Sequence, residues 1–130
     1  MNTITIKIQD CFANSDIFTV LSSPHLASIQ HHFDSIGKIK KLDVRNITKD
    51  DYDKLYKAFM NVNFNEVFNE NPDLLWFCSW TLICSFENGT AVISASVKCP
   101  EKDPSKPETT KLIEACELVC PVLDIANSVP

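Results

Sequence analysis

The chain opens with alternating apolar and polar residues, which is the pattern of a strand with one buried face. Residues 4–8 alternate isoleucine with threonine and lysine, and this period of two predicts a half-buried strand. A second strand is expected over about 17–21, because valine, phenylalanine and isoleucine gather there. Residues 14–16, Asn-Ser-Asp, are typical turn formers and are predicted to connect the two strands.

The next segment changes to the period of a helix. Ser23 is a suitable N-cap, and Pro24 suits the first helical position. Gly37 follows at a point where helices commonly end in left-handed backbone. A helix is therefore predicted up to residue 36, with an apolar stripe at spacings of three, four and three residues: Leu26, Ile29, Phe33 and Ile36.

A strand and a second helix are predicted in the following segment. Lys38–Arg45 is interpreted as a strand, with Leu42 and Val44 pointing inward. Thr48 is expected to cap a helix that carries acidic residues in its first turn and is followed by a short helical extension over 63–70. The apolar face of the capped helix comprises Tyr52, Leu55, Tyr56 and Phe59.

The firmest predicted element is an antiparallel hairpin from about Trp76 to Cys99. Asn88-Gly89 favours a two-residue type I′ turn. This turn and the hydrophobic pattern then predict the same register, because every pair on one face is apolar. The expected pairs are Cys84 with Ile93, Leu82 with Ala95, Trp80 with Val97, and Cys78 with Cys99.

A last helix completes a predicted α+β fold. Ser105 and Glu108 have the spacing of a capping box, and the helix that they open has the apolar stripe Leu112, Cys116, Val119 and Leu123. The element order ββαβα(α)ββα favours an antiparallel sheet of about four to five strands with helices packed on one face. The length fits a single domain over residues 1–130.

Composition narrows the classes of function. The net charge is −5, Arg45 is the one arginine, and the chain has two glycines. Nucleic-acid readers depend on arginine and phosphate-binding loops need several glycines, so we expect neither nucleic acid nor a nucleotide cofactor as a ligand. The start of the chain has no signal-peptide pattern and no segment is long and apolar enough to span a membrane, so a cytoplasmic protein with reduced cysteines is expected.

Charge is distributed unevenly along the chain. Residues 58–97 contain no lysine or arginine. A negative surface over this part would steer a basic partner toward it, although it can also serve only solubility. The acidic residues of this stretch are Glu66, Glu70, Asp73 and Glu87.

Candidate catalytic and metal-binding residues do not form a recognisable pattern. The six cysteines include no C-x-x-C pair, and we expect no metal site. Cys116 and Cys120 lie one helical turn apart, and with Cys78 and Cys99 they offer an alternative four-sulfur site. His31 and His32, adjacent on the predicted helix, would point about 100° apart as exposed side chains. No catalytic residue is assigned and no enzyme is expected.

Aromatic side chains crowd the start of the predicted hairpin. By the parity of the strand, Phe77 falls with Leu75 on the more polar face. An exposed Leu75–Phe77 pair would form an interaction patch, unless a neighbouring loop covers it. We therefore add Phe77 to the four acidic residues as an expected partner-binding residue.

The hairpin and closing helix resemble a known class of protein. The segments Trp80–Thr90 and Ser94–Pro100, followed by the last helix, are similar to the C-terminal hairpin and helix of small bacterial immunity proteins for secreted or contact-dependent toxins. The resemblance covers about 45 residues. It implies a small, acidic, cytosolic protein without enzymatic motifs that binds a cognate toxin domain, in many cases a basic nuclease, and covers its active site with carboxylates.

Two alternatives remain open. The first is a homo-oligomeric structural or adaptor domain that associates through the Leu75–Phe77 face or an open sheet edge. The second is a small enzyme that uses Cys11 or a histidine. The leading expectation is a monomeric or weakly dimeric binding protein.

Overall fold

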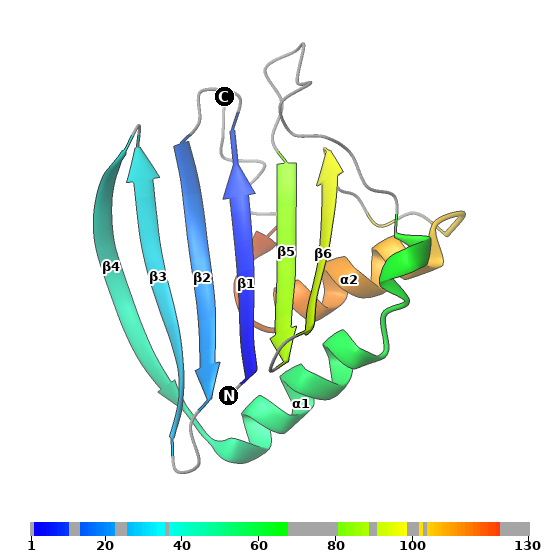
Figure 1. Cartoon of the computed structure of the whole chain (residues 1–130), viewed down its shortest axis with the longest axis horizontal. Helices are drawn as coiled ribbons and strands as arrows, with labels where there is room; N and C mark the ends of the chain where they lie inside the picture. The colour runs from blue at the N-terminus through cyan, green and yellow to red at the C-terminus, as the bar shows by residue number, and fades with distance from the viewer. Residues whose placement is uncertain are drawn as a thin grey trace.

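A computed structural model describes residues 2–10, 14–22, 26–35, 37–67, 81–88, 91–98, 102 and 104–122. These residues form a sheet of six strands, with two α-helices and one short 3-10 helix (Figure 1). The elements are β1 Asn2–Gln9, β2 Asn14–Ser22, β3 Ala27–Ser35, β4 Lys38–Ile47, α1 Lys49–Met60, η1 Phe64–Glu66, β5 Thr81–Asn88, β6 Ala91–Lys98 and α2 Pro107–Glu117. The predicted α+β class is confirmed, whereas the number and order of strands differ from the prediction.

The sheet is antiparallel throughout, in the order β4-β3-β2-β1-β5-β6. β1 lies inside the sheet because it pairs with β2 on one side and with β5, distant in sequence, on the other. Figure 1 shows α1 and α2 near the β1, β5 and β6 part of the sheet, with β4 at the opposite edge. Among the described strands, β4 and β6 are therefore the two edges.

One face of the sheet carries most of the core. Ile4, Ile6 and Ile8 are buried, as their alternation with polar residues predicts. Ile6 lies between Phe18 of β2 and Cys84 of β5, which are also buried. The helices add buried residues to the same cluster: Tyr52, Leu55 and Phe59 from α1, and Leu112, Ile113 and Cys116 from α2.

The predicted helix up to residue 36 is wrong, because this segment is strand β3. β3 pairs along its whole length with β2 on one side and β4 on the other. Its backbone groups thus find partners on both sides, which outweighs the weak local preference of the segment for a helix. Gly37 does adopt the left-handed conformation, with φ of 78°, but it lies beyond the end of β3, in the turn to β4. There its N–H donates to Asp34 Oδ1 at 3.2 Å.

Two further details of the first strands differ from the prediction. Residues 14–16 belong to β2 instead of a turn, since Ser15 pairs with both Gln9 and Asp34. In β4, Leu42 and Val44 do not point into the core and are 45% and 44% exposed. β4 is an edge strand, and Val44 pairs with Gln30 on the sheet face away from the helices, so alternation along most of β4 does not lead to burial.

The β5–β6 hairpin is present, but its register is shifted by two residues from the predicted one. Cys84 pairs with Ala95 and Leu82 with Val97. β5 ends at Asn88 and β6 begins at Ala91. A shift of two residues keeps each side chain on its predicted face, and the four residues of these two pairs are buried. Ile93, predicted on the packed face, is 43% exposed. Trp80, Cys78 and Cys99 lie outside the described residues.

The predicted caps have different outcomes in the two helices. Thr48 caps α1 as expected, because its Oγ1 accepts from the Asp51 N–H at 3.0 Å. α2 begins at Pro107, with Lys106 as N-cap instead of Ser105, so the predicted capping box is wrong. Leu112, Cys116 and Val119 are buried as predicted, and Leu123 lies outside the described residues.

Candidate functional site

The expected partner-binding residues are only partly within the described structure. Glu66 ends η1 and Glu87 lies near the end of β5, and both are exposed. Figure 1 shows η1, the short turn that follows α1, well separated from the end of β5, so these two carboxylates do not form one cluster. Glu70, Asp73 and Phe77 lie outside the described residues.

Glu66 is positioned by a short turn that is fastened to α2. Asn63 caps η1 because its Oδ1 accepts from the Asn65 N–H at 3.2 Å. The backbone N–H of Asn63 in turn donates to Oε1 of Glu108, in the first turn of α2, at 2.7 Å. Lys111 Nζ lies 2.8 Å from the other oxygen, Oε2, of Glu108. The Glu108 carboxylate therefore ties η1 to the start of α2.

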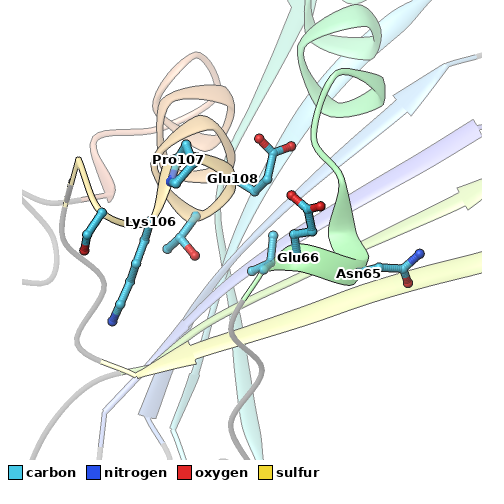
Figure 2. Close-up of a pocket in the computed structure, with 8 residues that line it drawn as sticks. Asn65, Glu66, Lys106, Pro107 and Glu108 are labelled. Atoms are coloured by element: carbon cyan, nitrogen blue, oxygen red, sulfur yellow. The ribbon is translucent and has the colours of Figure 1, made fainter.

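A pocket lies at this junction between η1 and α2. Its volume is about 440 Å³. Figure 2 shows the carboxylates of Glu66 and Glu108 on the same side of the pocket, while the Lys106 side chain extends away from them. The residues that line it are Asn65, Glu66, Val67, Ser105, Lys106, Pro107, Glu108 and Thr109.

The two carboxylates of the pocket differ in how they are compensated. The hydrogen bond from Lys111, followed by that from the Asn63 backbone, lowers the pKa of Glu108 below its usual value. Glu108 therefore stays ionised at neutral pH, with both oxygens occupied. Glu66 is exposed and makes no ion pair with any other residue that the structure describes. It is thus available to an ammonium or guanidinium group of a partner.

The sequence predicts Glu66 as a partner-binding residue, which stays a prediction, and gives no sign of the role of Glu108. The sequence signal at Glu108 was its position three residues after Ser105, which suggested a local cap. The actual acceptor contact is to Asn63, 45 residues away, and no short-range pattern encodes it. Lys106 and Asn65, which also line the pocket, carry no sequence signal of their own.

The cysteines that the structure describes are buried, which lowers their reactivity. Cys84, Cys116 and Cys120 are all free thiols. Burial, together with the neighbouring Cys84 thiol, raises the pKa of Cys116, and burial and the nearby charge of Asp16 raise the pKa of Cys120 to about 12. The raised pKa values keep Cys116 and Cys120 protonated at neutral pH, which disfavours these two thiols as nucleophiles or metal ligands. Among the described residues no group of His, Cys, Asp and Glu could hold a metal ion.

The histidines do not have the predicted helical arrangement. On strand β3, His31 and His32 point to opposite faces of the sheet. His31 is half-buried, with its Nε2 2.7 Å from Asp16 Oδ1 and its ring stacked on Phe18 at a centroid distance of 4.1 Å. The expectation of two exposed helical histidines is therefore wrong. Asp16 also contributes to the raised pKa of buried, protonated Cys120, so the described residues supply an oriented imidazole without an activated nucleophile.

The helices of the described part of the chain lack the length and apolar character that crossing a membrane requires. Comparison with protein-family models, with curated proteins and with solved structures gives no match. A function for this chain is therefore inferred from the chemistry of its own residues.

Proposed function

We propose that this chain is an acidic binding protein that neutralises a basic protein partner, and that its specific role is immunity against a toxin domain. The observation that carries the proposal is the Glu66 carboxylate, exposed and without an ion pair among the described residues, beside the η1–α2 pocket. In such a complex the pocket receives a lysine or arginine side chain of the partner, and the residues around the pocket cover the partner's surface.

Long-range electrostatics supports the same proposal. The chain carries a net charge of −5, and an acidic protein attracts a basic partner over distances that salt shortens. The hydrogen bonds of Glu108 hold η1 against α2, so the pocket is organised before a partner arrives. Such preorganisation reduces the entropy that binding must overcome.

The test is a pull-down with the tagged full chain from its native host at about 50 mM and about 500 mM NaCl. We expect a basic protein to be captured at low salt and released at high salt. Glu66→Lys should reduce capture about ten-fold, while Glu114→Lys, the same charge change on the exposed side of α2, should have little effect. Expression of the captured protein alone should harm the host, and co-expression of this chain should protect it.

The placement of the site is overturned if Glu66→Lys, Glu70→Lys, Asp73→Lys and Glu87→Lys each leave capture unchanged. The immunity role is overturned if the captured protein is harmless when expressed alone. Thermal unfolding of each variant shows that any loss of capture comes from charge and not from loss of the fold.

A further inference from the structure

Strand β4 is an open edge with an unusual surface. It pairs with β3 on one side, and no other described strand lies beside it. Residues 38–46 are all exposed, and Figure 1 shows β4 at the margin of the sheet. An edge strand of ten residues presents backbone N–H and C=O groups to which another strand can pair.

The charge of β4 is opposite to that of the whole chain. Four cationic side chains and the single carboxylate of Asp43 leave the strand with a net charge of +3, whereas the chain carries −5. The other described edge, β6, has no charged residue from Ala91 to Val97. The cations of β4 are Lys38, Lys40, Lys41 and Arg45.

Lysines and a bulge are also the usual protection of an edge strand. β4 has both, since its register with β3 shifts between His31 and His32. This protection acts against a second copy, because pairing β4 with itself sets one +3 strand beside another. It does not act against an acidic strand, whose carboxylates would face the lysines. The positive charge of β4 therefore disfavours pairing with a second copy and favours pairing with an acidic strand.

Exposed aliphatic side chains indicate that β4 does more than repel other strands. Ile39 is 72% exposed, and Leu42 and Val44 are nearly half exposed. A purely protective edge has no use for such side chains, which are costly in water. Ile39 and Val44 lie on the sheet face away from the helices, since they pair with Asp34 and Gln30.

A pocket on the helix side of β4 adds a place for a side chain. Its volume is about 280 Å³, and Ile29, Ile47, Leu55 and Leu118 form its apolar part. Arg45 and Lys54 line it together with Asp51, so its cations outnumber its carboxylate. Arg45 Nη2 donates to the Val119 carbonyl oxygen at 3.4 Å, which holds the guanidinium beside the end of α2. An apolar pocket with a cationic rim fits the aliphatic stem and carboxylate of a glutamate.

We propose that β4 is a docking edge that takes an extended, acidic segment of a partner protein as a seventh strand. Main-chain hydrogen bonds along β4 supply the pairing, and acidic side chains on the incoming strand face the lysines. A glutamate on the helix side enters the pocket beside Arg45. This mode of binding combines backbone pairing with pockets for alternate side chains. It is independent of the function proposed above, because it uses a different surface and the opposite charge.

The test uses a fluorescent peptide of alternating glutamate and valine, as long as the ten residues of β4, with a lysine–valine peptide as its control. Fluorescence anisotropy with the full chain should show binding of the acidic peptide only. The double variant Lys41→Glu/Arg45→Glu should weaken binding about ten-fold or more. Lys57→Glu on the exposed face of α1 and Glu66→Lys should leave it unchanged, which separates this result from the test of the Glu66 site.

Hydrogen exchange distinguishes strand addition from simple charge attraction. Amides of β4 that exchange quickly in the free protein should become protected when the acidic peptide binds. Equal binding of both peptides, absence of binding, or binding without protection of β4 overturns the proposal. Sedimentation of the free chain tests the other occupant. A dimer whose formation protects the β4 amides from exchange would assign this edge to a second copy and overturn the acidic partner.

Discussion

At the scale of single residues, the surroundings of a side chain decide whether it can react. Cys120 and His31 are both near Asp16, but with different consequences. The imidazole of His31 pairs with the carboxylate at 2.7 Å, whereas the thiol of Cys120 is buried and the same carboxylate contributes to raising its pKa. Asp16 thus interacts with both an imidazole and a thiol, and the thiol stays protonated at neutral pH.

We expect the thiols of Cys84, Cys116 and Cys120 to resist iodoacetamide in the folded protein at about pH 8, because all three are buried and the pKa values of Cys116 and Cys120 are raised. Peptide mapping by mass spectrometry after native and denaturing treatment measures this, with the denatured sample as the control. The raised pKa of Cys120, from 9.0 to about 12, also means that the unfolded thiol ionises first. Stability should fall as pH rises through this window. Rapid native labelling of Cys120 would contradict the expected burial.

At the scale of elements, the contact between η1 and α2 shapes the candidate site. Glu108 is close to the start of α2, where a negative charge is favourable to the helix dipole. It also accepts from the backbone of Asn63 and from Lys111. One carboxylate therefore joins two elements that are distant in sequence, and the wall of the pocket depends on it.

We expect Glu108→Gln to lower the melting temperature at about pH 7. The pKa of Glu108 is lowered in the folded state, so its stabilising contribution is present above the unfolded pKa and is lost as pH falls through the folded pKa. The difference from the unsubstituted protein should therefore shrink at about pH 3. Glu114→Gln, an exposed neighbour on α2, is the matched control. A melting difference that does not change with pH would show that packing, not charge, is responsible.

At the scale of the whole molecule, the core and the open edge occupy different parts of one sheet. The buried side chains of β1, β2 and β5 form one cluster with those of α1 and α2. β4 contributes only half-buried Ile47 to the border of this cluster. Stability thus depends on the covered part of the sheet, while β4 is free to serve another purpose.

We expect truncation to alanine to destabilise the protein in the core but not on β4. Phe59→Ala in the core should lower the free energy of unfolding by about 3–5 kcal/mol, because it opens a cavity. Val44→Ala on β4 should change it by less than about 0.5 kcal/mol, as is usual for exposed positions. Urea denaturation followed by circular dichroism measures both. A comparable loss in the two variants would mean that β4 is part of the stabilising core.

The elements that could be predicted correctly are those whose pattern is local. The alternation over 4–8 predicted β1, Thr48 predicted the start of α1, and the apolar stripes predicted the buried faces of both helices. The hairpin faces were also correct, although the register was not, because Asn88-Gly89 is a turn signal that a connection displaced by one residue also accommodates. In each case the determining interactions lie within a few residues of one another.

The remaining features depend on contacts between segments that are distant in the sequence. The spacing of Leu26, Ile29 and Phe33 suits a helix, but pairing with β2 and β4 makes the segment a strand, and such pairing energy has no local signature. The exposure of Leu42 and Val44 follows from the position of β4 at the edge of the sheet, which no pattern along the chain encodes. The contact of Glu108 with Asn63 likewise exists only once η1 and α2 meet. Glu66 was proposed as a partner-binding residue from its charge, but the pocket beside it was not predicted, because its walls come from segments that only folding brings together.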